Sequence, residues 1–226
     1  RIKKIPKTTW SSNDSLSYSP KLKTFVYLCL GLFIYGLGSS MLIHSNIGNA
    51  PWVVLAEGVS RKLNFSIGGA TFFISLIVLL IWIPLKQKPG VGTLMNSIII
   101  SIVMDLSTTF LNFSSTHFLI NFLTVLIGVL LAGIGSGIYL IANLGPGPRD
   151  GLMTGLQKNS QYPISVIRIF IETSVVIIGF ILGGTVGIAT MLFAAGIGPS
   201  VALGLKIVKL INSMKINIKP NNLIFF

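Results

Sequence analysis

One short stretch of the chain places two opposite charges side by side between apolar segments. In NLGPGPRDGLMTGL, residues 143–156, Arg149 and Asp150 directly follow a run of glycines and prolines. Proline cannot donate a backbone hydrogen bond and disfavours helix in the preceding residue, so the chain should break here and restart as a helix near Pro148. Asp150 would cap the first turn, and Arg149 would add positive charge at the positive end of the helix dipole. Such a site favours binding of an anion from a substrate or a lipid. An interfacial anchor is the alternative interpretation.

A second pair of opposite charges lies within an apolar run. In VIRIFIET, Arg168 and Glu172 are four residues apart and therefore share one helical face. A charge at the middle of a membrane span costs about 2.5–3.5 kcal/mol, so these two must pair and face water or the protein interior. A structural ion pair and a functional polar site are both open interpretations. Together with Arg149 and Asp150, the pair is expected to line one cavity open to the cytoplasm.

The other polar residues within or beside the apolar runs give weaker indications of function. Asp105 stands alone and is expected to reach the outer interface; His44 and Glu57 flank an earlier proline segment and are interpreted as interface positions. The single cysteine, Cys29, excludes an internal disulfide and a thiolate metal cluster. No metalloprotease, serine-hydrolase or nucleotide-loop motif is present. We therefore expect no metal, no cofactor and no enzymatic activity.

The composition is that of an integral membrane protein. Of 226 residues, 52% are hydrophobic and only 10% are charged, with a mean hydropathy of +0.83, against about 25% charged in soluble domains. The net charge of +12 comes from basic residues in tails and short connections. In a membrane protein this pattern indicates topology, so we expect no nucleic-acid partner.

Six apolar runs are long enough to cross a bilayer, which takes about 20 residues. Two shorter segments of the chain each begin at a proline and are too short to cross alone. The expected fold is an all-α, polytopic membrane helix bundle with six long spans and two broken or re-entrant helices. The predicted spans are 24–44, 67–85, 91–111, 118–142, 164–183 and 187–206, and the short helices are 51–62 and 148–159.

An internal repeat relates the two halves at a constant offset of 97 residues. It pairs the expected helix breaks, Gly48 with Gly145 and Pro51 with Pro148. It also pairs Asn46 with Asn143, which we add to the candidate substrate-binding or coupling residues. The predicted parts are a polar tail at 1–23, repeats at 24–111 and 118–206, and a basic tail at 207–226.

Orientation follows from the positive charges, which are enriched on the cytoplasmic side. The polar N-terminal tail is expected to be loose and cytoplasmic, and the C-terminal tail is also inside. The connections near 112–117 and 184–186 carry no charge and should face outward. The basic positions assigned to the cytoplasm are Arg1, Lys3, Lys4, Lys7, Lys21, Lys23, Lys86, Lys88, Arg149, Lys158, Lys206, Lys209, Lys215 and Lys219. Three spans per repeat would invert the second repeat, a design shared by many secondary transporters.

The second half resembles the YczE/YitT group of bacterial membrane proteins, and its YczE branch in particular. The resemblance rests on NLGPGPRDGLMTGL, VIRIFIE and GFILGGTVGIATMLFAAGIGP, extends over about residues 24–205 and omits the N-terminal tail. It implies a multi-span protein of the bacterial plasma membrane, with transport as the suggested role. The positions that match are Gly145, Pro148, Arg149, Asp150, Gly151, Arg168, Glu172, Gly187, Thr190, Gly198 and Pro199.

Two functions are compatible with these features. The first is a secondary transporter or exporter of a small molecule, anionic or amphipathic. The second is a non-transporting membrane partner that assembles or regulates another protein, with a homodimer as one possible assembly. A cavity lined by Arg149, Arg168 and Glu172 would favour transport; a sealed bundle would favour the partner role.

Overall fold

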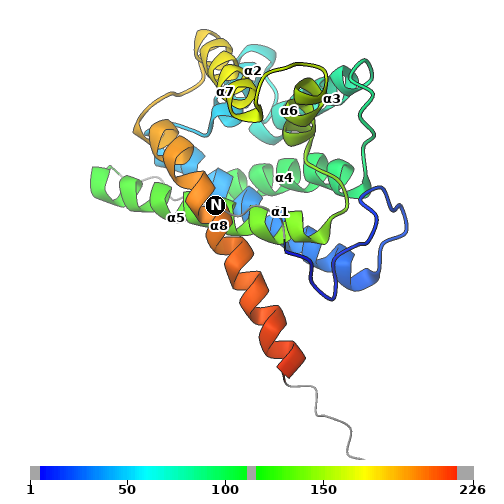
Figure 1. Cartoon of the computed structure of the whole chain (residues 1–226). Helices are drawn as coiled ribbons and strands as arrows, with labels where there is room; N and C mark the ends of the chain where they lie inside the picture. Colours follow the sequence, from blue (N-terminus) through cyan, green and yellow to red (C-terminus); the bar gives the residue numbers. More distant parts are fainter. Residues whose placement is uncertain (1–5, 111–115, 218–226) are drawn as a thin grey trace, which may run out of the picture.

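The structure, a computed structural model, describes residues 6–110 and 116–217 and contains helices and no strand within them. Eight helices follow one another along this part of the chain (Figure 1). The all-α fold is as predicted. The helices are α1 (Leu22–Ser45), α2 (Pro51–Leu63), α3 (Ile67–Trp82), α4 (Val91–Phe110), α5 (Phe118–Ala142), α6 (Pro148–Lys158), α7 (Ile164–Ile181) and α8 (Ile188–Asn217).

Five of these helices are long and apolar enough to cross a membrane. A sixth crossing is obtained if α2 and α3, bent by 109° at their junction, count as one broken span. α3 alone has 16 residues and is shorter than its predicted range of 67–85. α8 continues past residue 206 to Asn217, so the beginning of the predicted C-terminal tail is helical. Most of the 112–117 connection, together with Arg1, Lys3, Lys4 and Lys219, lies outside the described residues.

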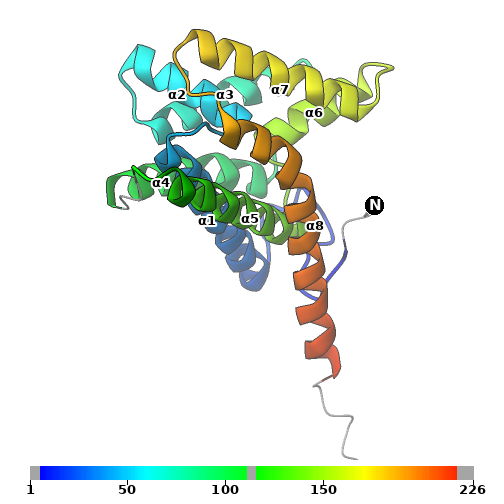
Figure 2. The same ribbon diagram turned by 90° about the vertical axis from the view of Figure 1, so that its left-hand side faces the viewer.

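The helices form two groups with separate apolar cores. α1, α4, α5 and α8 pack around a core that includes Leu28, Leu32 and Met104. α2, α3, α6 and α7 pack around a second core centred on Trp82 and Ile74. Figure 2 shows the second group lying above the first, with α7 uppermost. Each short helix packs against a long helix of the other repeat, α2 against α7 and α6 against α3.

Glycines allow α1 and α5 to approach each other closely. A Cβ added to Gly38 would lie 2.5 Å from the Gly128 carbonyl oxygen, and one added to Gly135 would lie 2.5 Å from that of Gly31. These two contacts are equivalent under the offset of 97 residues. Small residues let helix backbones approach in membrane proteins, where lipid competes for every larger apolar surface.

Other backbone features also occur twice, 97 residues apart. The Gly92 N–H donates to the Leu144 carbonyl (2.7 Å), and the Ala189 N–H donates to the Ile47 carbonyl (3.0 Å). Seven described residues have positive φ, and six of them form three pairs at this offset: Asn46 and Asn143, Gly48 and Gly145, Lys86 and Gly183. The two halves therefore use the same turns at the same places.

The N-terminal segment is ordered against the helices, so the expectation of a loose tail is wrong for residues 6–21. Trp10 is buried and stacks on Tyr27, with ring centroids 4.4 Å apart. The Ser12 N–H donates to the Ala142 carbonyl (3.0 Å), and the Tyr18 hydroxyl donates to the Pro89 carbonyl (2.7 Å). The segment is polar and basic in composition, but it contains Trp10. Burial of this aromatic side chain offsets the conformational entropy that is lost when the segment becomes ordered.

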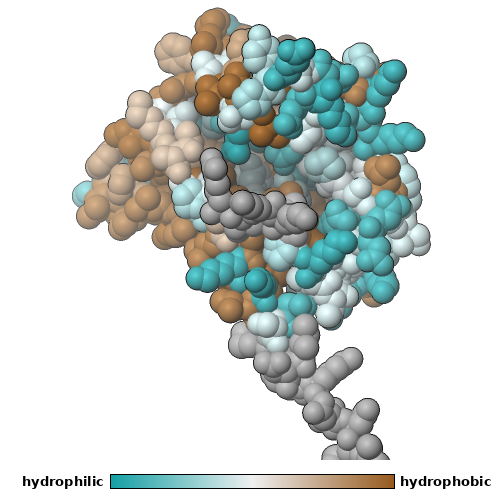
Figure 3. Space-filling view, in the orientation of Figure 1, coloured by the Kyte–Doolittle hydropathy of each residue, from teal (hydrophilic) through white to brown (hydrophobic). Residues whose placement is uncertain are grey.

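The molecular surface divides by polarity in a way that fits a membrane protein. Figure 3 shows apolar residues over the side where α5 begins, and mostly polar residues over the opposite side, near the N-terminal segment and the α3–α4 connection. Many large apolar side chains of α5 and α7 are exposed, among them Leu119, Phe170 and Ile181. In a bilayer these side chains contact lipid.

Candidate functional site

The two broken segments have the geometry that their prolines and glycines predict. Asn46 and Asn143 end α1 and α5 in the left-handed conformation, and α2 and α6 restart at Pro51 and Pro148. Neither restarted helix has a side-chain cap at its N-terminus. Both asparagines are absent from the cavity described next, so the structure gives them a role in ending helices.

A cavity of about 260 Å³ lies between the two helix groups. Both broken segments contribute to it, as does one face of α7, so the predicted convergence of Arg149, Asp150, Arg168 and Glu172 on one cavity is observed. The lining residues are Tyr35, Ala50, Pro51, Trp52, Asn96, Ile100, Ser136, Tyr139, Leu140, Arg149, Asp150, Met153, Arg168, Glu172, Phe193, Ile197, Gly198 and Val201.

Arg149 lies over the indole ring of Trp52, with the guanidinium carbon 5.2 Å from the ring centroid. The two residues occupy equivalent positions in the repeats, so the restarted helices meet at their first turns. A cation at this distance from an aromatic face is attracted by the ring quadrupole. Arg149 forms no ion pair within the described part of the chain. Its guanidinium N–H groups therefore remain available to a ligand in the cavity.

Asp150 does not cap α6 as predicted. Its Oδ2 accepts a hydrogen bond from the hydroxyl of Tyr139 on α5 (2.9 Å). Tyr139 is buried, and this bond satisfies its hydroxyl while fixing the start of α6 against α5. Sequence reasoning missed Tyr139, because its distance from Asp150 depends on how the chain turns between the two helices.

Arg168 and Glu172 form the expected ion pair, with Nε 2.8 Å from Oε1. The Arg168 side chain is 51% exposed and that of Glu172 is 25% exposed. The pair thus lies at an open part of the cavity wall and not in a packed core. Each charge of the pair has its partner, so among the described residues that line the cavity Arg149 is the cation that forms no ion pair.

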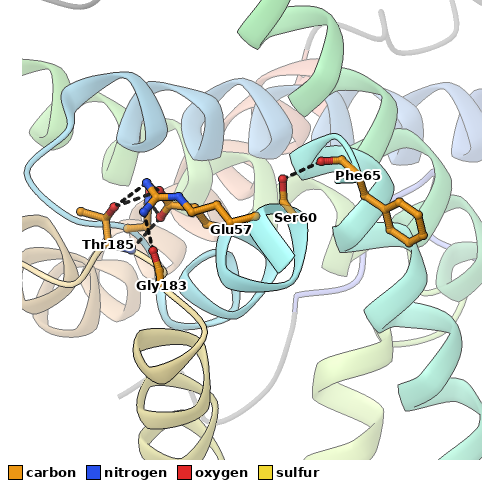
Figure 4. A network of polar contacts seen from close by, with 7 residues as sticks. Glu57, Ser60, Phe65, Gly183 and Thr185 are labelled. Carbon is orange, nitrogen blue, oxygen red and sulfur yellow. Dashed lines mark hydrogen bonds and ion pairs between the residues drawn. The ribbon is translucent and has the colours of Figure 1, made fainter. Parts of the chain in front are cut away.

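Glu57 is a centre of polar contacts, a role that the sequence did not indicate. Its carboxylate is buried and accepts hydrogen bonds from Asn49 (2.9 Å), Arg61 (2.6 Å) and both the backbone and the hydroxyl of Thr185 (2.7 and 2.8 Å). Figure 4 shows this network joining α2 to the loop between α7 and α8. The four-residue spacing of Glu57 and Arg61, the same as in Arg168–Glu172, was the available signal.

Asp105 also has a structural partner. Its two carboxylate oxygens accept from the Ser66 hydroxyl (2.6 Å) and the Gly68 N–H (2.7 Å), so a residue of α4 caps the start of α3. The capping function follows from tertiary packing.

Comparisons with known proteins match this chain to one family. The model of a family of unknown function, DUF6198, matches residues 22–206. The chain belongs to this family. The match begins at α1 and ends within α8, so it covers both broken helices and the whole cavity lining.

Three relatives extend this result. An uncharacterized protein of Haemophilus influenzae is 39% identical over 208 residues, which cover 92% of this chain and 94% of that protein. The uncharacterized membrane protein YczE of Bacillus subtilis is 28% identical, over 73% and 77% of the two chains. The uncharacterized protein YyaS of the same organism is 29% identical, over 74% and 85%. The resemblance to the YczE branch is thereby confirmed. No solved structure matches the chain.

Proposed function

We propose that this protein is a secondary transporter of small amphipathic anions in the bacterial plasma membrane. The observation that carries the proposal is a cavity between two uncapped half-helices, in which Arg149 lies over the Trp52 ring and forms no ion pair with any described residue. Half-helix N-termini and an unpaired arginine favour a negative group. In transporters, such discontinuous helices form substrate sites between repeats.

The charges of the cavity and its lining residues indicate the class of substrate. Glu172 neutralises Arg168, and Asp150 is engaged by Tyr139, so an added anion is recognised by Arg149. The rest of the wall offers apolar contacts from Ile100, Phe193 and others. A volume of about 260 Å³ suits a small molecule. A carboxylate joined to a short apolar or aromatic body fits this combination.

In the proposed transporter, the two halves form an inverted repeat and both termini lie in the cytoplasm. The paired backbone hydrogen bonds and paired positive-φ residues support two copies of one fold. Three crossings per copy would place the copies in opposite orientations, related by a two-fold axis in the membrane plane. The cavity then lies near that axis, where both broken segments meet.

Binding of simple probe anions tests the proposal. Benzoate and hexanoate, at millimolar concentration, are expected to raise the thermal unfolding temperature of the purified protein. Benzyl alcohol and benzylamine, which lack the negative group, are expected to have no such effect. Counterflow of radiolabelled benzoate in proteoliposomes then measures transport directly.

Arg149→Gln should abolish the benzoate effect while the protein still folds. Lys158→Gln is the matched control, because it removes one positive charge at the exposed far end of the same helix. If Arg149→Gln responds to benzoate like the parent protein, the anion site is wrong. If Arg149→Gln abolishes benzoate binding but the parent protein shows no benzoate counterflow, the anion site is correct and the transport function is wrong. The role of a non-transporting membrane partner then replaces that of a transporter.

A further inference from the structure

The two helix groups meet at the α3–α4 contact and at its equivalent in the second repeat, the α7–α8 contact. These two contacts differ in how closely the helices pack. At one edge α3 packs closely against α4, and a Cβ added to Gly68 would collide with the Ser101 carbonyl. Asp105 adds its two hydrogen bonds to the start of α3 at this contact. This edge of the cavity is closed.

The equivalent edge is open. α7 and α8 correspond to α3 and α4 in the second repeat, yet they barely touch. Figure 2 shows α7 above the first half of α8 and separated from it. Gly198, the equivalent of Ser101, would have no atom within 4 Å of an added Cβ. The space beside Gly198 belongs to the cavity.

The helix faces at the two edges also differ in chemistry. On α3, Thr71 and Ser75 are buried, and the Thr71 hydroxyl contacts the Met104 sulfur (3.9 Å). Their equivalents on α7 are Arg168 and Glu172, which face the open cavity. Closing α7 onto α8 in the way that α3 closes onto α4 would bury this ion pair beside Gly198.

We propose that the gap between α7 and α8 is the entrance to the cavity, and that α7 closes it by adopting the α3–α4 contact. The Arg168–Glu172 pair lines this gate and is desolvated when it shuts. Since two charges are costly to bury unless they are paired, the gate closes only with the pair intact. The proposal rests on the proposed transport function for its purpose, but its geometry is independent of any ligand.

Polar residues of the first repeat hold the opposite edge shut. Asp105 caps α3, while the equivalent residue on α8, Ala202, has no side chain that could cap α7. The sequence difference between the repeats therefore biases the molecule toward a closed α3–α4 edge and an open α7–α8 edge. Weakening the first edge should favour closure of the second.

Disulfide crosslinking tests the gate in the full-length protein in membranes, with Cys29 replaced by serine. Ser165→Cys with Ala202→Cys should crosslink under mild oxidation, because the equivalent residues Gly68 and Asp105 are in hydrogen-bond contact. Phe170→Cys with Ala202→Cys is the matched control, since Phe170 is 72% exposed on α7. Thr8→Cys with Ser11→Cys is the positive control for oxidation, because those side-chain oxygens are 2.9 Å apart and lie outside the gate.

The expected result is crosslinking of the 165–202 pair several-fold faster than the 170–202 pair. Adding Asp105→Ala should increase the 165–202 rate roughly tenfold, because hydrogen bonds to a charged group are lost at the closed edge. Equal rates for the two pairs, alongside efficient crosslinking of the 8–11 pair, would overturn the gate. The experiment uses no ligand, so a failure of benzoate binding leaves its outcome interpretable.

Discussion

At the scale of single residues, the two buried or half-buried glutamates have different functions, and this difference can be measured. Glu57 accepts four hydrogen bonds, whereas Glu172 has one half-exposed partner. Glu57→Gln should destabilise the protein by about 3 kcal/mol, because buried donors lose a charged acceptor. Glu172→Gln should cost about 1 kcal/mol or less. Thermal unfolding in detergent checks the order, and equal losses would contradict it.

Trp52 is expected to support anion binding through its contact with Arg149. Trp52→Leu should weaken benzoate binding roughly twofold to fivefold, because a cation–π contact of about 0.5–1 kcal/mol is lost. Trp52→Phe keeps an aromatic face and should lose less. The benzoate-dependent rise in the thermal unfolding temperature measures the affinity of the parent protein and of both variants. Identical affinity of the leucine and phenylalanine variants would exclude a role for the ring.

At the scale of helices, the contact between α2 and α7 depends on two glycines, Gly58 and Gly179. A Cβ added to Gly179 would lie 2.6 Å from the Leu55 backbone nitrogen, so Gly179→Ala must push two helices apart. The expected loss is about 1–3 kcal/mol. Gly198→Ala is the matched control, because that position meets open space and alanine favours helix. Comparable melting of the two variants would mean that α2 and α7 are not in contact.

The N-terminal segment is expected to stabilise the bundle through its single aromatic anchor. Trp10→Ala should lower the free energy of unfolding by about 3 kcal/mol, because the ring is 6% exposed and stacks on Tyr27. Trp10→Phe should recover part of this loss. Limited proteolysis provides a second measurement, since residues 6–21 should become cleavable only in the alanine variant. Unchanged stability of that variant would restore the loose-tail interpretation.

At the scale of the whole molecule, the inverted repeat predicts that equivalent residues at the ends of α2 and α6 lie on opposite sides of the membrane. Lys62 and Asn159 are exposed and separated by the repeat offset. Single cysteines at these positions, with Cys29 replaced by serine, should react with impermeant maleimide from opposite sides. Lys62→Cys should label in intact cells and Asn159→Cys only after permeabilisation. Labelling of both from one side would exclude the inverted arrangement.

The sequence by itself determined the elements. Apolar runs of about 20 residues, interrupted by proline and glycine, specify where helices start and stop, since these limits follow from local backbone constraints. The repeat offset and the four-residue spacing of Arg168 and Glu172 were equally readable, because both are relations along the chain. The positions of α2 and α6 were therefore predicted closely.

Only the tertiary structure decided which elements meet. Glu57 and Thr185 are 128 residues apart, and Trp52 meets Arg149 across the two repeats. Hydropathy measures how much a helix prefers lipid to water, but not the direction in which each polar side chain points. The crossing of helices at glycines sets those directions. The burial of Trp10, the capping by Asp105 and the gap between α7 and α8 depend on that packing, and so they appear only in the folded molecule.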